Sequence, residues 1–278
     1  MEQLARLKAR LTTLTELGDI IVAMRALAAA ALQEGRQALP AVSRYALLIE
    51  NGIADVAAML DATSEQAAED TGEAETICVI GSEHGFVGDL NAELLTGVDL
   101  PRAYRLIVVG RRLQVVAAER RLKIAAALPM TTHVAGVSLL ARRIAACVGA
   151  ATYVRLVIVK HEASKAEVVI KARQVLPVQL PAPGTKTSPP PLHQLNARQL
   201  LAELAGEYLL AEISRALIEA LIEENQIRLG VLSAADKNVS DKKEELRRKE
   251  RTLRQETITT DLLDVVVGAE AVTETERL

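Results

Sequence analysis

Aromatic residues are almost absent from this sequence. Its 278 residues include no Trp, one Phe and four Tyr. Aliphatic side chains must therefore fill the core, a composition that favours helices over a β-sandwich. A chain of this length is long enough for one large domain or two smaller ones.

The sequence also lacks a bias toward one charge and a set of cysteines. It has 33 basic and 36 acidic residues, a net charge of -3, so no overall attraction to nucleic acid or to an anionic membrane is expected. Cys78 and Cys147 lie far apart in apolar stretches. They are predicted to be buried thiols in a reducing compartment, not a disulfide.

Near the start, no apolar run is long enough for a membrane span. The longest one, residues 20–32, is interrupted by Arg25 and preceded by Glu16 and Asp19. Neither a signal peptide nor a transmembrane helix fits this pattern. A soluble, cytoplasmic protein without direct membrane insertion is expected.

The first 60 residues have the pattern of one long helix. Apolar residues recur in steps of three and four at Leu4, Leu7, Leu11, Leu14, Leu17, Ile21, Met24, Leu27 and Ala31. This narrow seam suits packing against a partner helix. Pro40 is expected to kink or break the helix.

Residues 74–176 are predicted to form a small Rossmann-like α/β domain. Short β-branched runs alternate with helical segments, which indicates a mainly parallel sheet. The expected strands are 76–80, 105–109, 153–159 and an edge strand at 167–175, and the expected helices are 91–96, 111–121 and 137–147. Residues 61–75 are polar and small, as in a connecting loop.

A proline-rich strap is predicted at 177–195, because prolines at this density exclude a helix or a central strand. From 196 to 278 the pattern is again helical. Two long helices at the ends of one chain, separated by a domain that returns the chain, most simply form an antiparallel coiled coil.

The stretch "GSEHGFVGDLN", residues 81–91, raises the question of a phosphate-binding loop. Its glycines stand at 81, 85 and 88, which is not the G-x-G-x-x-G spacing of dinucleotide loops. It lacks a Lys-Ser/Thr pair, and Glu83 and Asp89 would repel a phosphate. No nucleotide or other cofactor is therefore expected.

Metal and nucleophilic chemistry are also not expected. The histidines lie in separate segments with no second ligand at metal spacing: His84, His133, His161 and His193. Ser82 stands beside Glu83, but adjacent residues at a strand end point in different directions, and the G-x-S-x-G elbow is absent.

Basic residues gather at 242–254, with glutamates among them. They fit a solvated helix face with i,i+4 pairs, or a contact with an acidic partner. Beyond them, "TITTDLLDVVVGAEAV", residues 257–272, turns apolar after Asp264 where a solvated end is expected. An apolar end on a projecting helix needs a partner to cover it.

These features together resemble the gamma subunit of the rotary F-type ATP synthase. "RQETITTDLLDVVVGAEAV", residues 254–272, resembles the final-helix signature of that family. "IIVAMRALAAAAL", residues 20–32, resembles its Ile-x-x-Ala-Met segment, and the loop 81–91 is similar to its S-D-R-G-L-x-G-x-L-N motif. Glu224, Arg228, Ala234, Ala235 and Asn238 hold the spacing of its E-x-x-x-R and A-A-x-x-N pattern.

The resemblance implies a non-catalytic central-stalk rotor that couples ion flow, proton or sodium, to ATP synthesis or hydrolysis. Its implied partners are a hexamer of alpha and beta subunits, the epsilon subunit and the membrane c-ring, with no nucleic acid. The implied location is the cytoplasmic face of a bacterial cell membrane, as a peripheral part of the complex.

The resemblance also implies roles for particular residues. Rotor contacts with the stator are expected at Met24, Arg228, Arg254, Gln255 and Thr259. The bearing of the hexamer is expected to hold Leu262, Leu263, Val265, Val266 and Val267. The loop facing the beta subunit is expected to use Ser82, Glu83, His84, Gly85 and Val87.

Departures from the family pattern indicate a divergent member, such as the gamma subunit of a second rotary ATPase. Glu83, His84 and Phe86 replace Asp, Arg and Leu, Asp89 replaces a Gly, and Thr260 stands where Gln is common. Two other hypotheses remain: a small α/β nucleotide-binding enzyme with a coiled-coil oligomerisation arm, and an adaptor that uses its coiled coil against other helices.

Overall fold

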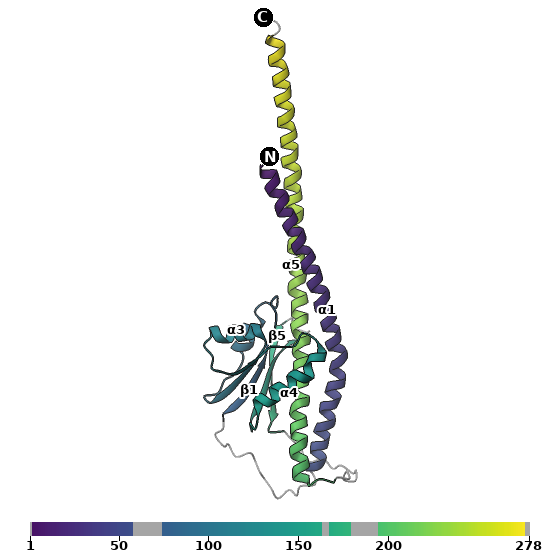
Figure 1. Ribbon diagram of the computed structural model, residues 1–278, viewed down its shortest axis with the longest axis vertical. Helices are drawn as coiled ribbons and strands as arrows, with labels where there is room; N and C mark the ends of the chain where they lie inside the picture. Colours follow the sequence, from purple (N-terminus) through teal and green to yellow (C-terminus); the bar gives the residue numbers. More distant parts are fainter. Residues whose placement is uncertain (1, 58–73, 163–166, 179–193, 276–278) are drawn as a thin grey trace. The chain divides into compact units, whose positions relative to one another are not determined.

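The computed structural model describes residues 2–57, 74–162, 167–178 and 194–275 (Figure 1). The elements in chain order are α1 (Glu2–Ala57), β1 (Glu75–Ile80), α2 (Leu90–Thr96), β2 (Tyr104–Val109), α3 (Arg111–Glu119), β3 (Ile124–Leu128), the short 3₁₀ helix η1 (Val134–Gly136), α4 (Val137–Val148), β4 (Val154–Glu162), β5 (Glu167–Leu176) and α5 (Ala197–Thr275).

The chain divides into two compact units, each described here by itself. Unit 1 comprises Met1–Leu27 and Gly230–Leu278, and unit 2 comprises Ala28–Leu229. Unit 1 thus contains the first part of α1 and the last part of α5. Unit 2 contains the remaining parts of both helices together with the sheet.

Unit 2 is built on a five-stranded sheet with the order β3-β2-β1-β4-β5. The pairings among β3, β2, β1 and β4 are parallel, and β5 pairs with β4 in the antiparallel direction. The prediction of end helices flanking a mainly parallel α/β sheet is confirmed.

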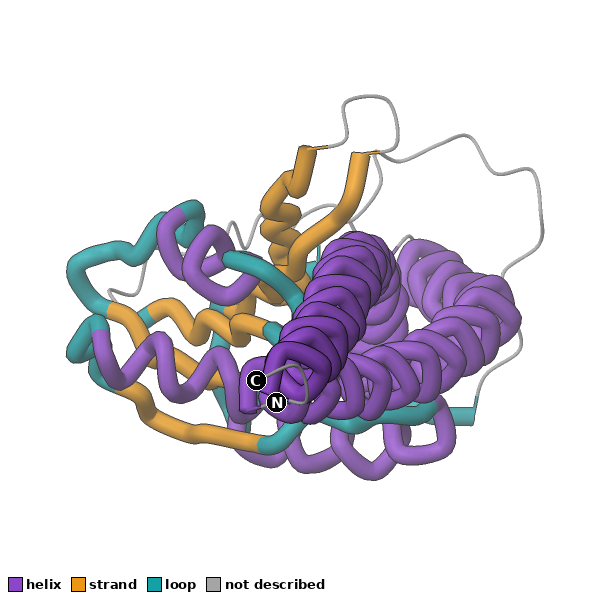
Figure 2. The backbone as a smooth tube through the Cα atoms, turned by 90° about the horizontal axis from the view of Figure 1, so that it is seen from above, coloured by secondary structure: helices purple, strands orange, loops and turns teal. Residues whose placement is uncertain are grey.

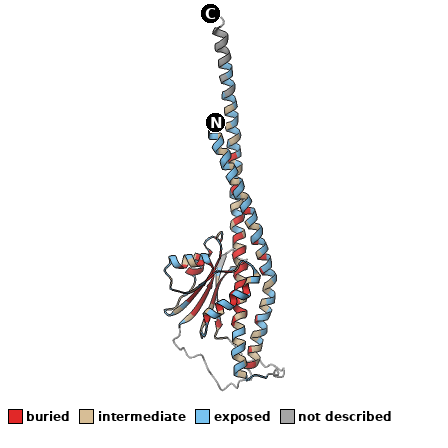
Figure 3. Ribbon diagram, in the orientation of Figure 1, coloured by how far each residue is buried: buried red, intermediate tan, exposed pale blue. Residues whose placement is uncertain are grey.

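Alternate residues of the central strands point to opposite faces of the sheet, and both faces are covered by helices (Figure 2). On one face, Cys78 and Ile80 belong to a cluster that includes residues of α4 and α5. On the other, Ile77 and Val79 pack with residues of α2 and α3. Both sets of side chains are buried, as is usual for parallel strands (Figure 3).

Strand β3 was not predicted. Its sequence, Ile124–Leu128, is IAAAL, and alanine has a weak preference for strands. Pairing with β2 determines its conformation, since Leu106 lies opposite Ile124 and Val109 lies opposite Leu128. Tertiary contact has overridden local preference here.

Within unit 2, α1 and α5 lie side by side and run antiparallel. Gly35 faces Ile222, the Tyr45 hydroxyl bonds to Glu207, and Gly52 faces Leu204. Along these three contacts the residue numbers increase in α1 and decrease in α5, which shows that the two helices run in opposite directions. A Cβ at Gly35 would lie 2.8 Å from Ile222 Cγ1, so only glycine fits this contact without a shift.

Unit 1 has the same antiparallel pairing. Gly18 faces Val239, and Arg25 Nη1 lies 2.7 Å from Asp236 Oδ2. The predicted seam is wrong at Leu17 and Leu27, whose side chains are 43% and 72% exposed. The apolar contact in unit 1 is formed by Ile21, Leu232 and Val239, with Leu14, Met24 and Ala235 packed against them.

Pro40 does not break α1, which stays helical from Glu2 to Ala57. The predicted connecting loop at 61–75 lies outside the described residues up to residue 73, as does the strap from residue 179 to 193. Within the described ranges, no helix has both the length and the apolar character required to cross a lipid bilayer.

Candidate functional site

The loop at 81–89 follows the carboxyl end of β1, where the chain direction across the sheet reverses. From β1 the chain moves to β2 and β3 on one side, and α4 then returns it to β4 on the other side of β1. Such a switch point is where open α/β sheets bind ligands. The residues around this loop therefore decide whether the sheet has a binding site.

A carboxylate of the protein occupies the position next to the start of α3. Glu83 Oε2 accepts hydrogen bonds from the backbone N–H of Arg111, at 3.1 Å, and of Met130, at 2.8 Å. Its Oε1 lies 3.0 Å from Arg111 Nε. Helix N-termini attract anions, and here the anion is Glu83.

The first turn of the loop is fixed by a second buried pair. The backbone N–H of Ser82 donates to Asn91 Oδ1 at 3.0 Å, and Asn91 Nδ2 donates to Ser82 Oγ at 2.8 Å. Both residues are buried. The Ser82 hydroxyl therefore serves as a structural acceptor and does not face solvent as a nucleophile.

Helix α5 holds the middle of the loop. Arg228 Nε donates to the carbonyl oxygen of Gly85 at 3.2 Å, and Nη1 donates to Asn225 Oδ1 at 2.9 Å. Arg228 also forms an ion pair with Glu224, which in turn accepts a bond from the backbone N–H of His84 at 3.5 Å. Two charged side chains of α5 thus fix the peptide groups 83–84 and 85–86 of the loop.

The space left at this switch point is small. A cavity of about 10 Å³ is lined by residues of β1, α2, β4 and α5, including Gly81 and Glu224. A volume of that size is at the limit for one water molecule. Side chains of the protein therefore fill the place where a phosphate would bind.

This burial corrects part of the predicted interface. Ser82, Glu83 and Val87 are 0%, 7% and 4% exposed. They cannot present a surface to another subunit, because each packs or bonds inside unit 2. His84 is exposed and Gly85 is partly exposed, so these two positions remain candidates for an external contact.

Arg228 was likewise predicted as a contact to another subunit. Its side chain is 9% exposed and is used within unit 2 by Gly85, Glu224 and Asn225. The E-x-x-x-R spacing that singled it out places Glu224 and Arg228 one helical turn apart, where they pair. The residue acts inside the fold.

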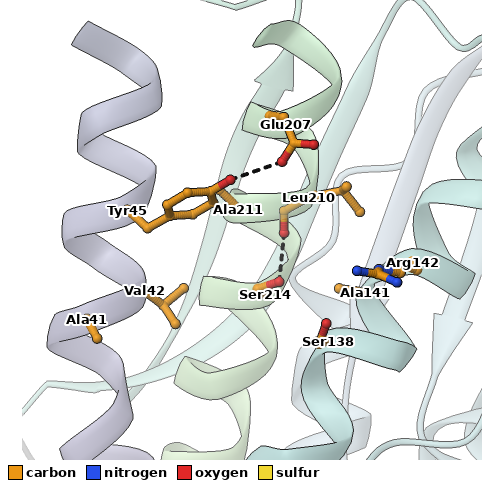
Figure 4. A pocket seen from close by; sticks show the side chains of 10 residues that line it. All are labelled: Ala41, Val42, Tyr45, Ser138, Ala141, Arg142, Glu207, Leu210, Ala211 and Ser214. Carbon is orange, nitrogen blue, oxygen red and sulfur yellow. Dashed lines mark hydrogen bonds between the residues drawn. The ribbon is translucent and has the colours of Figure 1, made fainter. Parts of the chain in front are cut away.

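An open groove of about 390 Å³ lies between α1, α4 and α5 in unit 2 (Figure 4). Its polar groups bind one another: the Tyr45 hydroxyl donates to Glu207 Oε2 at 3.0 Å, and Ser214 Oγ donates to the Leu210 carbonyl at 2.7 Å. The bond to Glu207 raises the pKa of Tyr45, with burial contributing less. No acid–base pair is set up for catalysis by these bonds.

Met24 lies in unit 1, beside an apolar cluster. Ile21, Leu232 and Val239 form its buried part, and Met24 packs against it while remaining partly exposed. The position therefore both stabilises the helix pair and leaves some surface for a partner.

Arg254, Gln255 and Thr259 lie together on α5 in unit 1 and are exposed. Thr259 Oγ1 donates to the Gln255 carbonyl at 2.9 Å, a bond within the helix. In the described part of the chain, no partner is found for the Arg254 guanidinium. These side chains are free to contact another protein.

The apolar residues that follow are also exposed. Leu262, Leu263, Val265 and Val266 are 62%, 59%, 69% and 53% exposed. The Val267 side chain lies outside the described residues. Four exposed apolar side chains within five residues indicate a surface that another molecule covers.

Cysteine chemistry is not supported at Cys78. Burial raises the pKa of its thiol to about 12, with a smaller contribution from Cys147. Cys147 is partly exposed, which corrects the prediction that both thiols are buried. Among the described residues, no group of His, Cys, Asp or Glu is arranged to hold a metal ion.

The structure thus brings the loop residues together with Arg228 in unit 2, and it places Arg254, Gln255 and the apolar residues after them along one helix of unit 1. Sequence reasoning missed the contacts of Glu83 with Arg111 and Met130. It also missed a charge cluster between β5 and α5. Their partners lie far apart in the chain, so no spacing rule could find them.

Comparison with known families and proteins gives a consistent result. A family model described as ATP synthase matches residues 3–272. The ATP synthase gamma chain of Anaeromyxobacter sp. (strain K) is 25% identical over 98% of this chain and 99% of its own. That of Geotalea daltonii is 29% identical over 104 residues, which span 37% of this chain and 36% of the relative.

The fold also matches solved structures of rotary complexes. A chain of the Euglena gracilis mitochondrial ATP synthase, in a structure of its OSCP, F1 and c-ring, is similar with a TM-score of 0.66 and 12% identity over 100% of this chain and 97% of that one. A chain of the rotor of the same synthase gives a TM-score of 0.58 and 14% identity, over 92% and 99%. Together with the family match, which covers nearly the whole sequence, these likenesses lead to one conclusion: the chain belongs to the ATP synthase family, and the curated relatives it matches are gamma chains.

Proposed function

We propose that this chain is the central-stalk rotor subunit of a rotary ATP synthase. It couples ion flow through a membrane ring to ATP synthesis or hydrolysis at sites formed by alpha and beta subunits. The chain itself is non-catalytic. Ion identity, proton or sodium, is a property of the ring.

One observation carries this proposal beyond the family match. In unit 1, α5 bears Leu262, Leu263, Val265 and Val266 with more than half of each side chain exposed. A partner that encloses the helix would remove this apolar surface from water. The bearing of an alpha-beta hexamer is such a partner.

The same assembly accounts for the exposed polar residues just before this surface. Arg254 can donate paired hydrogen bonds to a carboxylate on a beta subunit, and Gln255 and Thr259 lie along the same helix. We assign these three, with Met24, to rotor–stator contacts. His84 and Gly85 are the loop positions assigned to the beta subunit.

The arrangement at the switch point argues against the nucleotide-binding enzyme. Glu83 bonds to the amide at the start of α3 and to a second amide at Met130, so a phosphate would meet a carboxylate there. The sheet then supports α5 and does not serve as a catalytic centre.

The proposed organisation follows the predicted segments. Residues 1–60 and 196–278 form the shaft helices, 74–176 the α/β domain, and 177–195 the connecting strap. The epsilon subunit and the c-ring are the proposed partners of the α/β domain. The proposed location is the cytoplasmic face of a bacterial cell membrane, held there by the complex.

The test is reconstitution of the full chain with alpha and beta subunits from the same organism. The isolated chain should hydrolyse no ATP, and a stable complex with one copy of it should form and show rotation during hydrolysis. If the chain did not co-purify with an alpha-beta hexamer, the rotor assignment would be overturned. Saturable nucleotide binding by the isolated chain would instead support the enzyme.

A further inference from the structure

A cluster of four charged side chains joins the edge strand β5 to helix α5 inside unit 2. Arg173 of β5 places Nη1 2.7 Å from Glu212 Oε2 and Nη2 3.2 Å from Glu219 Oε2. Arg215 of α5 bonds to the same two carboxylates, at 3.1 Å and 3.2 Å. These two cations and two anions are named here the β5–α5 cluster, and Lys171 of β5 lies near enough to interact with Arg173, Glu219 and Arg215.

The cluster is largely removed from water. The side chains of Glu212, Glu219 and Arg173 are 3%, 17% and 18% exposed, and that of Arg215 is 30% exposed. Burial by itself lowers the pKa of Arg173, but the carboxylates of Glu219 and Glu212 outweigh burial and raise it. The positive charge of Arg173 therefore persists at any working pH.

Helical geometry explains how one arginine reaches two glutamates. Glu212 and Glu219 are seven residues apart, close to two turns of α5, so they lie on the same face with their Cα atoms about 10 Å apart. The planar guanidinium of Arg173 presents its two Nη groups in a fork, one to each carboxylate. The fork thus fixes one point of the strand between two turns of the helix.

The apolar contact beside the cluster fixes this position poorly. The face of α5 in the cluster with the sheet repeats its residue types every four positions: Leu209, Ile213, Leu217 and Leu221 form one row, and Ala216 and Ala220 another. A slide by one turn would therefore replace each buried side chain with a similar one, and hydrophobic burial has no preferred direction. Apolar packing alone would tolerate a slide of α5 by one turn at modest cost.

The charges do not tolerate such a slide. A shift of four residues in one direction would place Ala216 and Glu223 where Glu212 and Glu219 now lie, leaving Arg173 with one carboxylate fewer. A shift in the other direction would place Tyr208 and Arg215 there, so that Arg173 would meet a second arginine. A buried charge without a partner is costly, which excludes both alternatives.

We propose that the β5–α5 cluster sets the axial and rotational register of α5 on the sheet and thereby transmits torque between the α/β domain and the shaft. The torque role rests on the proposed function. The register role does not, because it concerns the isolated chain. Arg173 is the positioning residue, since it is the member of the cluster that the sheet supplies.

The decisive variant replaces the whole cluster with apolar residues, Arg173→Leu, Glu212→Leu, Arg215→Leu and Glu219→Leu. Such replacements commonly preserve or raise stability, because no charge is left unpaired. The melting temperature should therefore be unchanged or higher. If the cluster served stability alone, this variant would show no other change, and the position of α5 on the sheet would stay the same.

Register is read by electron-spin distance measurement in the full chain. Spin labels at Val169 on β5 and Glu203 on α5, both exposed, report the position of the helix along the strand. Cys147→Ala removes the partly exposed thiol from the background, and Cys78 is buried. In the apolar variant we expect a roughly twofold broader distribution, or a second population displaced by about 5 Å, one helical turn.

Arg173→Lys and an exposed ion pair provide the controls. Lysine keeps the charge but lacks the fork, so Arg173→Lys should give a distribution of intermediate width. Glu244→Gln disrupts the exposed Glu244–Arg248 pair of α5 and should leave the distribution unchanged. A single distribution at the original distance in the apolar variant would overturn the proposal.

In the assembled complex, the matching readout is the number of ions pumped per ATP hydrolysed. The apolar variant should hydrolyse ATP while pumping at a ratio reduced by about half or more. A displaced register with an unchanged ratio would overturn the torque role. If the unsubstituted chain failed to assemble, the proposed function would fail, whereas the distance measurement would still decide the register role.

Discussion

The backbone N–H of Met130 donates a hydrogen bond of 2.8 Å to Glu83 Oε2, although the two residues are 47 positions apart in the chain. The same oxygen accepts the N–H of Arg111. One carboxylate thus joins the loop after β1, the start of α3 and the segment after β3. Glu83 is a fixed part of the fold at the place where related α/β sheets bind ligands.

Replacing Glu83 with alanine should destabilise the protein by about 1–3 kcal/mol, because the buried amide of Met130 loses its acceptor. Equilibrium unfolding in urea measures the change. Glu93→Ala is the control, since Glu93 is exposed on α2, and its effect should stay within about 0.5 kcal/mol. Equal effects of the two variants would contradict a specific role for Glu83.

Substitutions of Arg228 and Glu224 should have strongly non-additive effects on the free energy of unfolding. Arg228→Ala leaves a buried carboxylate unpaired and should cost about 3–5 kcal/mol. Adding Glu224→Gln should recover part of that loss, so the double variant is less destabilised than the sum of the single ones. Hydrogen exchange at the His84 amide should accelerate in each variant. Strict additivity would show that the pair does not act as a unit.

Cys78 should make the protein less stable at high pH. Its pKa is raised from 9.0 to about 12 by burial, so the folded state holds the proton more tightly. The stabilisation is complete below the unfolded pKa and is lost as the pH rises from about 9 toward 12, with a slope approaching about 1.4 kcal/mol per pH unit. Other groups titrate in this range, so the difference between the protein and Cys78→Ala isolates the effect. Identical slopes would contradict it, and Cys147→Ala provides the control.

Two helical glycines of unit 2, Gly35 and Gly206, should respond in opposite ways to alanine. Gly206→Ala meets nothing within 4 Å and should stabilise the protein by about 0.5–1 kcal/mol through helix preference. At Gly35 the same change brings a Cβ to 2.8 Å from Ile222 Cγ1, and overpacking of about 1–3 kcal/mol should cancel or exceed the gain. Comparable stabilisation at both sites, measured by thermal unfolding, would show that α1 and α5 are not in close contact at Gly35.

The proposed rotor contacts are tested by Arg254→Ala combined with Gln255→Ala. Both side chains are exposed, so helix content by circular dichroism should be unchanged. In the assembled complex, coupled ATP turnover should fall, by roughly tenfold if one charge-assisted hydrogen bond worth about 1.4 kcal/mol is lost. Arg251→Ala, on an exposed residue one turn earlier, is the control. Unimpaired turnover in the double variant would remove these residues from the interface.

Patterns local in the sequence predicted the fold well. β-branched runs located β1, β2 and β4, whose central residues are buried on both faces of the sheet, and alternation of residue types located the edge strand β5. The helical period located α1 and α5, because a helix that packs along one side buries apolar residues at that spacing. β3 could not be found in this way, since its alanines carry no strand signal of their own.

Local sequence patterns could not predict the contacts of the site. Glu83 and His84 are adjacent in sequence, yet one is buried and the other exposed, and only the positions of Arg111 and Met130 explain the difference. The helical period predicts that Leu27 is buried in the helix contact, but Leu27 faces solvent and its neighbour Ala28 is buried instead. The charges of α5 at 212, 215 and 219 look like ordinary surface pairs until β5 supplies Arg173.

The antiparallel pairing of α1 with α5 has a consequence for how such chains can change in length. Gly35 and Gly52 are two positions of α1 that contact α5. One residue inserted between them, or between their partners on α5, would turn the rest of that helix by about 100° and carry one of these contacts out of register. Insertions and deletions should therefore be rejected within the paired stretches and accepted in the connections between elements. In the paired stretches of α1 and α5, many residues can be substituted over evolution, whereas the lengths of the helices cannot change.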